Sequence, residues 1–395
     1  MKIAILTSGG LAPCLSAAIG GFVQRYTELD KNVEIVTYLN GYQGLLLGQS
    51  RTITERARLE AYHLLKFGGS PIGNSRVKLS NVKDCEKKGL IRAGQNPFEV
   101  AAHQLMKDQV NILHTIGGDD TSTTAAELAH FLAQNNYPLR VVGLPKTIDN
   151  DIFPIRQSLG AMTAAEQGAV FFENVVHEHS ANSNMLIIHE IMGRNCGWLT
   201  YATAACYTSR LVQKTFAPAL GFPKEKFEIH GIYIPEIEFD LEREVKRLKP
   251  LFDQLGCLNL FVSEGACVTA IVKELEKNGE KVARDAFGHI KLDHINAGKW
   301  VGEQFSKALG AQKMLVQKSG YFARSAAPNA FDLHLIQSCV DFAVECACKG
   351  MSGLVGHDET QRDTLRCIEF EKVKGGKLLD VNNSHVQQFL QSINK

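Results

Sequence analysis

Short apolar runs that end in glycine-rich or charged turns constrain the fold of this chain more than any other feature. Residues 2–6 form one such run, which ends in Thr7-Ser8-Gly9-Gly10 and precedes a helix-compatible stretch at residues 15–23. The same order recurs at residues 33–39, 110–116 and 140–144. Buried strands that alternate with helices predict a mainly parallel sheet covered by helices on both faces.

A second group of apolar runs predicts a second lobe. Its strand candidates are residues 185–191, 229–234 and 258–262, beyond a helical stretch at about 161–176. A chain of 395 residues is long enough for two domains. We therefore expect an α/β protein with two lobes, each a mainly parallel sheet covered by helices. The expected lobes are residues 1–160 plus about 325–370, and residues 161–324 plus the C-terminal segment.

Two polar segments are predicted to lie at the surface. Residues 236–249 have the charge pattern of a solvated helix face, and residues 372–377 have the glycine and lysine content of a surface turn.

The charge balance limits the possible partners. Lys and Arg total 43 and Asp and Glu total 42, so the chain has no overall field that would bind nucleic acid or an anionic membrane. The opening MKIAILTSGG is too short for a signal-peptide core, and the ten cysteines form no CxxC pair with zinc spacing. These features predict a cytoplasmic protein with no nucleic-acid or membrane partner.

Ligands of open parallel sheets bind beyond the carboxyl ends of the strands, so the loops at these ends are the candidate sites. Gly9 and Gly10 would let the main chain approach an anion, although such a turn is equally common as a structural feature. The GxxxxGK[ST] and GxGxxG patterns are absent from the sequence, which argues against a P-loop ATPase and a dinucleotide site.

The loop after residues 110–116 places two carboxylates, Asp119 and Asp120, behind Gly117-Gly118. A helix N-cap would need only one of them. Because Mg²⁺ is usually held by one or two carboxylates together with substrate phosphates, the pair favours a metal-bearing site.

The loop after residues 140–144 combines Lys146, Thr147, Asp149 and Asp151. If the loop is extended, both carboxylates point to the same side, where one could accept a hydroxyl proton and the other could help to hold a metal. An Asx-rich turn explains the aspartates but not the lysine and threonine. In a fourth loop, Met192-Gly193-Arg194 follows the strand at residues 185–191, which places an arginine where it could bind phosphoryl oxygens.

With these four loops in this order, the chain resembles the phosphofructokinase family over nearly its whole length. The most specific matches are Gly117-Gly118-Asp119, Thr147-Ile148-Asp149-Asn150-Asp151 and Met192-Gly193-Arg194. Weaker matches are Gly73-Asn74-Ser75-Arg76, Ser263-Glu264-Gly265 and Gly320-Tyr321-Phe322-Ala323-Arg324.

The resemblance implies a role for each matching residue. Asp149 would be the general base for the C1 hydroxyl of fructose 6-phosphate, with Lys146, Thr147 and Arg194 also catalytic. Asp119 would bind Mg²⁺, with Asp151 as a second candidate ligand. The lobe that begins the chain would bind the phosphoryl donor, and the other lobe fructose 6-phosphate. The implied substrate-binding residues are Gly9, Gly10, Arg76, Asp120, Asp151, Met192, Gly193, Glu264, Lys318, Tyr321 and Arg324.

Two departures from the ATP-dependent pattern bear on the donor. Asp120 and Lys146 stand where ATP-using relatives typically have glycine, and both match the pyrophosphate-dependent branch. The carboxylate of Asp120 would repel the α-phosphate of a nucleotide, and Lys146 would offset the charge of pyrophosphate. The resemblance therefore implies reversible, Mg²⁺-dependent phosphoryl transfer from pyrophosphate to fructose 6-phosphate in glycolysis or gluconeogenesis.

Other departures concern the sugar phosphate. Met185 and the neighbourhood of Leu315 lack the arginines with which bacterial ATP-dependent relatives reach a neighbouring subunit, and Lys318 could supply compensating charge. Leu11 replaces an acidic residue that is common in the first glycine loop.

Three alternatives remain at this point. An ATP-dependent phosphofructokinase is opposed by Asp120 and Lys146. The NAD kinase and lipid kinase group shares the Gly-Gly-Asp pattern but not residues 147–151. A non-catalytic sugar-phosphate-binding paralogue would be expected to lose its base, whereas Asp149 is present. We expect a homodimer, with a tetramer as the other possibility.

Overall fold

The structure is a computed structural model that describes residues 1–279 and 295–394. It divides into two compact units. Unit 1 comprises Met1–Thr163 and Arg324–Lys377, and unit 2 comprises Ala164–Ala323 and Leu378–Lys395. The chain therefore passes from one unit to the other after Thr163, after Ala323 and after Lys377.

Unit 1 is built on a sheet with the strand order β11-β10-β5-β4-β1-β2-β3. The inner strands pair in parallel, and the edge strands β3 and β11 pair antiparallel to their neighbours. The strands are β1 (Lys2–Thr7), β2 (Glu34–Tyr38), β3 (Ser50–Thr52), β4 (Ile112–Gly117), β5 (Arg140–Pro145), β10 (Gly353–Asp358) and β11 (Thr364–Ile368). The α-helices are α1 (Leu15–Leu29), α2 (Tyr42–Leu47), α3 (Glu55–Glu60), α4 (Val82–Lys87), α5 (Pro97–Lys107), α6 (Asp119–Gln134) and α13 (Ala330–Cys348). The short 3-10 segments are η1 (Ala61–Lys66), η6 (Glu359–Gln361) and η7 (Phe370–Lys372).

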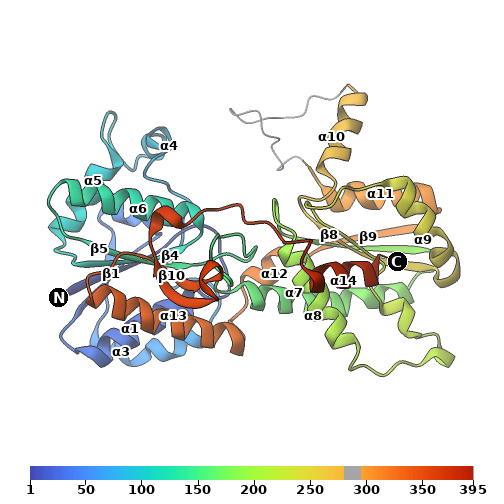
Figure 1. Ribbon diagram of the computed structural model, residues 1–395, viewed down its shortest axis with the longest axis horizontal. Coiled ribbons are helices and arrows are strands. Elements are labelled where there is room, and N and C mark those ends of the chain that lie inside the picture. Colours follow the sequence, from blue (N-terminus) through green and yellow to red (C-terminus); the bar gives the residue numbers. More distant parts are fainter. Residues whose placement is uncertain (280–294, 395) are drawn as a thin grey trace. The chain divides into compact units, whose positions relative to one another are not determined.

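Helices cover both faces of this sheet, with α5 and α6 on one face and α1 and α13 on the other (Figure 1). The first face buries Leu113 and Val141 of the strands against Leu105 of α5 and Leu128 of α6. On the second face, two polar side chains are buried and hydrogen-bonded to each other: Tyr26 Oη of α1 lies 2.7 Å from His114 Nε2 of β4. Burial lowers the pKa of His114 to about 3, so this imidazole is neutral.

Unit 2 contains a sheet with the strand order β7-β8-β6-β9, in which the neighbouring strands pair in parallel. The strands are β6 (Met185–Ile191), β7 (Gly231–Tyr233), β8 (Cys257–Ser263) and β9 (Lys313–Lys318). The α-helices are α7 (Ala161–Val175, which begins in unit 1), α8 (Trp198–Leu211), α9 (Leu241–Leu255), α10 (Val268–Lys277), α11 (Ala297–Leu309), α12 (Gly320–Arg324, which ends in unit 1) and α14 (Ser384–Ile393). The short 3-10 segments are η2 (Val176–Ser180), η3 (Pro218–Leu220) and η4 (Lys224–Phe227).

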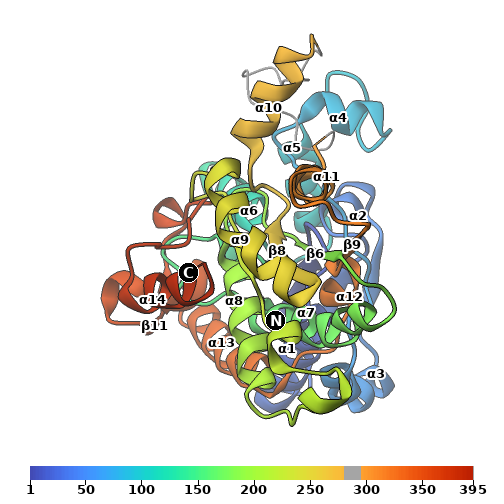
Figure 2. The same ribbon diagram turned by 90° about the vertical axis from the view of Figure 1, so that its right-hand side faces the viewer.

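Different side chains pack on the two faces of the unit 2 sheet. Leu248 and Phe252 of α9 and Phe305 of α11 form an apolar cluster with β6 and β8. On the other face, Phe172 of α7 packs edge-on against Phe261 of β8, with ring centroids 4.7 Å apart. Helix α10 projects from this unit in both ribbon views (Figures 1 and 2).

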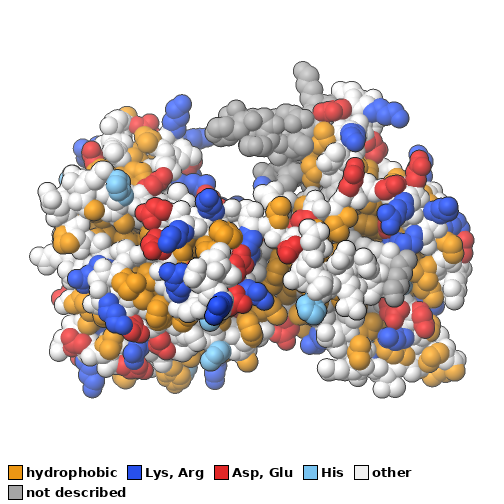
Figure 3. All heavy atoms as spheres, in the orientation of Figure 1, with side chains coloured by type: hydrophobic (Ala, Val, Ile, Leu, Met, Phe, Trp, Pro, Cys, Tyr) orange, Lys and Arg blue, Asp and Glu red, His pale blue; other side chains and the backbone are white. Residues whose placement is uncertain are grey.

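The predicted α/β fold class with parallel sheets is confirmed, and the apolar runs in both units form strands close to their predicted positions. One prediction was inaccurate: the polar helix expected at residues 236–249 begins only at Leu241, where the Asp240 side chain accepts a hydrogen bond from the Arg243 N–H. Basic and acidic side chains are mixed over the drawn face of each unit (Figure 3). Among the described residues, no helix combines the length and the apolar character needed to cross a membrane.

Candidate active site

The register of the unit 1 sheet brings three of the predicted loops to one edge. Thr7 at the end of β1 pairs with Ile116 of β4, and Gly117 pairs with Pro145 at the end of β5. The residues that follow these strands therefore emerge side by side. The carboxyl ends of neighbouring parallel strands are where ligands of such sheets bind.

Gly9 and Gly10 form a turn that positive charges surround. Gly9 has φ +90°, a conformation that glycine adopts readily, and a Cβ atom at this position would lie 3.0 Å from Lys146 Nζ. A Cβ atom on Gly10 would lie 2.9 Å from Arg324 Nη1 and 3.6 Å from Arg76 Nη2. Two small residues thus let three cationic side chains gather at one turn, an arrangement suited to a compact polyanion.

The loop of Arg76 is fixed to this turn by hydrogen bonds. The Gly9 N–H donates to the Ser75 carbonyl over 2.9 Å, and Ser8 Oγ donates to the same carbonyl over 3.1 Å. Arg76 itself is exposed. The main chain therefore positions an arginine whose guanidinium remains accessible to a ligand.

Lys146 is the buried member of the group, with only 4% of its surface exposed. Its Nζ donates to the Gly10 carbonyl. The pKa of Lys146 is lowered to about 8, mainly by burial. The charges of Arg324 and Arg76 act in the same direction, whereas Cys14 and Asp149 act in the opposite direction. A buried ammonium among other cations is costly, and a bound anion would stabilise its charged form.

The loop that follows Lys146 is ordered by internal hydrogen bonds. Thr147 Oγ1 donates to Asp151 Oδ1 over 2.9 Å and accepts from the Asp149 N–H over 3.1 Å. Asp149 and Asp151 are therefore both hydrogen-bonded to one threonine hydroxyl, Asp151 through its carboxylate and Asp149 through its main-chain N–H.

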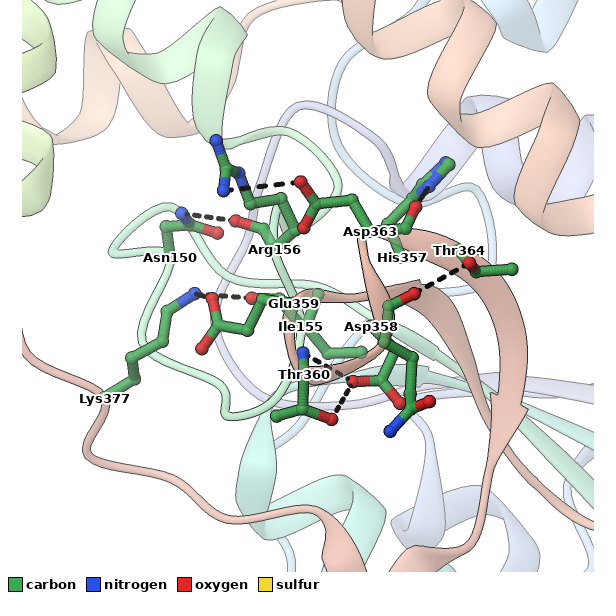
Figure 4. A network of polar contacts seen from close by, with 11 residues as sticks. Asn150, Ile155, Arg156, His357, Asp358, Glu359, Thr360, Asp363, Thr364 and Lys377 are labelled. Carbon is green, nitrogen blue, oxygen red and sulfur yellow. Dashed lines mark hydrogen bonds and ion pairs between the residues drawn. The ribbon is translucent and has the colours of Figure 1, made fainter.

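Asn150 joins this loop to the chain that follows it. It is buried, with 3% of its surface exposed, and has φ +52°. Its Nδ2 donates to the Arg156 carbonyl over 3.2 Å (Figure 4), and its Oδ1 accepts from the Ser158 N–H over 2.7 Å. Asparagine is one of the few residues that both tolerates this backbone conformation and offers a donor and an acceptor.

We predict that Asn150→Ala lowers the free energy of unfolding by about 1 to 3 kcal/mol, because the buried Ser158 N–H and the partly buried Arg156 carbonyl lose their partner. Asn150→Gly should recover roughly 1 kcal/mol of this loss, since glycine accepts the left-handed backbone. Urea denaturation of the three proteins tests both values. An alanine variant as stable as the wild type would show that the amide does not hold the loop.

Asp119 and Asp120 are the first two residues of α6. Asp120 forms an ion pair with Lys78, with Nζ and Oδ1 2.6 Å apart. Partial burial raises the pKa of the Asp119 carboxyl, and the charges of Asp120 and Asp151 raise it further. A carboxyl whose pKa is raised by burial and by neighbouring carboxylates suits a divalent cation, because Mg²⁺ prefers oxygen ligands and would offset this repulsion.

In unit 2, the loops after β6 and β8 interlock. Ile191 pairs with Ser263 at the ends of the strands, and the Glu264 N–H donates to the Ile191 carbonyl over 2.8 Å. A Cβ atom on Gly265 would lie 1.8 Å from the Arg194 carbonyl oxygen. Two segments that match the family pattern are thus packed tightly against each other: Met192-Gly193-Arg194 and Ser263-Glu264-Gly265.

The segment after β9 lies beside this structure. A Cβ atom on Gly320 would lie 3.1 Å from Met192 Sδ, and Tyr321 is 83% exposed. Lys318 forms an ion pair with the buried Glu190, with Nζ and Oε1 2.6 Å apart. The predicted site residues that belong to unit 2 are Met192, Gly193, Arg194, Glu264, Lys318 and Tyr321.

Arg324 lies in unit 1, and its Nη1 donates to the Leu11 carbonyl over 3.2 Å. Its place in the same sequence match as Tyr321 suggested a common role at the sugar phosphate. In this structure its guanidinium lies at the Gly9-Gly10 turn, because Gly10 leaves space for it and the Leu11 carbonyl accepts its hydrogen bond.

Sequence reasoning missed two lysines that contact this group of residues. Lys78 pairs with Asp120, and Lys377 donates its N–H to the Asp151 carbonyl over 2.9 Å. Lys78 stands two residues after Arg76 in a loop that the sequence did single out, so its position was a usable signal. For Lys377 the only signal was the segment 372–377, which was predicted to be a surface turn.

Comparison with known proteins identifies the family. The family model named Phosphofructokinase matches residues 2–347. The chain belongs to the phosphofructokinase family. This membership confirms the predicted resemblance and decides against the NAD kinase and lipid kinase group.

Two curated relatives of this family are similar over almost the whole chain. The pyrophosphate--fructose 6-phosphate 1-phosphotransferase of Methylotuvimicrobium alcaliphilum is 59% identical over 392 residues, which cover 99% of this chain and 96% of the relative. The protein of the same name from Mastigamoeba balamuthi is 55% identical over 391 residues, which cover 99% and 95%.

A solved structure of the phosphofructokinase family has the same fold. The pyrophosphate-dependent phosphofructokinase of Marinobacter aquaeolei matches with a TM-score of 0.74 and 18% sequence identity, over 99% of this chain and 91% of that one. At this identity the match shows the fold alone.

Proposed function

We propose that this phosphofructokinase transfers a phosphoryl group from pyrophosphate to the C1 hydroxyl of fructose 6-phosphate, which gives fructose 1,6-bisphosphate and phosphate. The observation that carries the proposal is full-length similarity at 59% and 55% identity to proteins named for this reaction. The cationic turn formed by Gly9, Gly10, Arg76, Lys146 and Arg324 supports it, since pyrophosphate is a compact polyanion.

Asp149 is the proposed general base. In the forward reaction the C1 oxygen attacks the terminal phosphorus of pyrophosphate, the bond from that phosphorus to the bridging oxygen breaks, and the hydroxyl proton passes to the Asp149 carboxylate. Thr147 orients this loop through its bonds to Asp149 and Asp151. Lys146 stabilises the charge of the leaving phosphate, and Arg76 and Arg194 offset charge on the transferring group.

Asp120 is the proposed barrier to ATP. Its carboxylate follows Asp119 at the start of α6, and the ion pair with Lys78 restricts its position. A nucleotide whose α-phosphate approached this carboxylate would meet like-charge repulsion. Pyrophosphate lacks the nucleoside and its α-phosphate, so it avoids this cost.

Asp119, with Asp151, would hold Mg²⁺ together with phosphate oxygens of the substrate. The bound ion would neutralise phosphoryl charge in the transition state. The raised pKa of the Asp119 carboxyl and its proximity to other carboxylates support this assignment.

The sugar phosphate is proposed to bind through unit 2. Met192, Gly193 and Glu264 would contact the sugar, and Tyr321 and Lys318 its 6-phosphate, for which Arg324 is a further ligand by family resemblance. Residues 1–160 with 325–370 would then form the donor lobe. We also propose a cytoplasmic homodimer that acts on these small substrates without a nucleic-acid or membrane partner.

A donor comparison tests the function. Purified protein with fructose 6-phosphate and Mg²⁺ should form fructose 1,6-bisphosphate with pyrophosphate, and show no turnover above background with ATP at equal concentration. Turnover with ATP alone would reject the roles of Asp120 and Lys146. Binding of fructose 6-phosphate without turnover on either donor would instead support a non-catalytic paralogue.

A further inference from the structure

Residues 374–377 of unit 1, called here the C-terminal strap, pair with the loop that carries Asp149 and Asp151. The Phe153 N–H donates to the Lys374 carbonyl over 2.7 Å, and the Lys374 N–H donates back to the Phe153 carbonyl over 2.9 Å. The Lys377 N–H donates to the Asp151 carbonyl over 2.9 Å. Because residues 374–376 are exposed, these backbone hydrogen bonds, rather than burial of apolar surface, hold the strap in place.

The side chain of Lys377 anchors the end of the strap. Its Nζ donates to the Ile155 carbonyl and forms an ion pair with Glu359 Oε2 at 3.2 Å (Figure 4). The two side chains are only 16% and 27% exposed, so solvent screens this pair less than a surface ion pair. Through its N–H and its Nζ, Lys377 thus binds carbonyls at both ends of the turn from Asp151 to Ile155.

The same strap contacts the other predicted carboxylate site. A Cβ atom on Gly375 would lie 2.0 Å from Asp119 Oδ2. This close approach excludes a side chain at position 375 unless the Asp119 carboxylate moves. Three residues in sequence, from Gly375 to Lys377, therefore contact both Asp119 and the main chain of Asp151.

We propose that the C-terminal strap positions the carboxylates of Asp119 and Asp151 relative to each other for phosphoryl transfer, with Lys377 as its anchoring residue. This inference rests on the proposed function. Lys377 acts through the Asp151 and Ile155 carbonyls, so it is a positioning residue. Phosphoryl transfer depends mainly on positioning and charge, which makes such an anchor consequential.

The test compares Lys377→Met with the wild type. We expect kcat with pyrophosphate to fall roughly 10- to 100-fold, the range that a displacement of about 1 Å can cause. The KM for fructose 6-phosphate should change less than about threefold, because the residues proposed to bind fructose 6-phosphate lie in unit 2, apart from Arg324. Hydrogen exchange of the peptide covering residues 149–158 should become faster, while exchange at residues 1–10 should not change.

Three further variants make the result specific. Lys372→Met removes a lysine of the neighbouring segment whose ion pair with Glu369 is exposed, and should retain wild-type kcat and exchange. Lys377→Arg keeps the charge and the donors and should retain kcat within about threefold of the wild type. Gly375→Ala should lower kcat because its methyl group displaces the Asp119 carboxylate.

The outcomes distinguish a failure of the strap proposal from a failure of the proposed function. A wild-type protein that does not turn over with pyrophosphate rejects the function, and the exchange measurement still tests whether Lys377 holds residues 149–158. Wild-type kcat in Lys377→Met, with or without faster exchange, would overturn the positioning role. So would a loss of kcat with unchanged exchange at residues 149–158. If the Lys377→Met protein does not fold, Gly375→Ala with wild-type kcat would overturn it.

Discussion

Asp149→Asn should lower kcat with pyrophosphate by roughly 10²- to 10⁴-fold, the contribution of a positioned general base. Asparagine has the size of aspartate but cannot accept the C1 hydroxyl proton. The loop should survive the change, because Thr147 Oγ1 accepts from the main-chain N–H of residue 149 and donates to Asp151. Steady-state kinetics with both substrates saturating measures the effect, and isothermal titration should show fructose 6-phosphate binding within about threefold of the wild type.

Asp363→Asn is the matched control for this experiment. Asp363 is likewise an aspartate of a unit 1 loop, and its carboxylate forms a largely exposed ion pair with Arg156 at 3.4 Å (Figure 4). The same amide replacement there should leave kcat unchanged, because exposed ion pairs contribute little. Retention of more than a tenth of wild-type kcat by Asp149→Asn would place the base elsewhere.

The strands and the edge at which the loops meet could be predicted because each depends on short stretches of sequence. A buried parallel strand has an apolar run, and a glycine-rich or charged turn marks its end, as at Gly9-Gly10 and at Lys146. Parallel register then places such ends along one edge without further information. The four loops were therefore accessible from local patterns.

Contacts between distant segments have no such local signal. Ile155 and Lys377 are 222 residues apart, and their hydrogen bond uses a backbone carbonyl, which any residue offers. Nothing in the periodicity near Lys377 indicates this partner. The glycines of the segment correctly suggested an exposed turn, but the sequence could not show that the turn pairs with Phe153 and approaches Asp119.

The position of Arg324 shows a different limit. A match to a family pattern assigns a residue to a ligand, but the conformation of its side chain depends on what lies within reach. Here a glycine at position 10 leaves space for the guanidinium, and the Leu11 carbonyl accepts its hydrogen bond. Long arginine side chains often reach partners that their sequence neighbours do not contact.

Lys146→Met should lower kcat with pyrophosphate by roughly 10²- to 10³-fold, the effect of removing one preorganised donor of positive charge. In the wild type, kcat/KM for pyrophosphate should fall above about pH 8, where the buried side chain loses its proton. In Lys146→Met, residue 146 has no proton to lose, so this decrease of kcat/KM at high pH should be absent. Rate measurements from pH 6.5 to 9.5 compare the two proteins, with Lys372→Met as a control that retains wild-type rates.

The same substitution should make the folded protein more stable at pH 7, although it removes a hydrogen bond to the Gly10 carbonyl. Burial lowers the pKa of Lys146 from 10.5 to about 8, so the charged form is disfavoured in the fold by on the order of 3 kcal/mol. Between these pKa values the unfolded chain binds a proton that the folded chain lacks, so the stability of the wild type rises with pH there. The stabilising effect of Lys146→Met should therefore be greatest below pH 8 and shrink towards pH 10.5. Urea denaturation at pH 7 and pH 9.5 measures this trend. A variant less stable than the wild type at pH 7 would mean that Lys146 supports the fold, and its loss of activity would then say nothing about pyrophosphate.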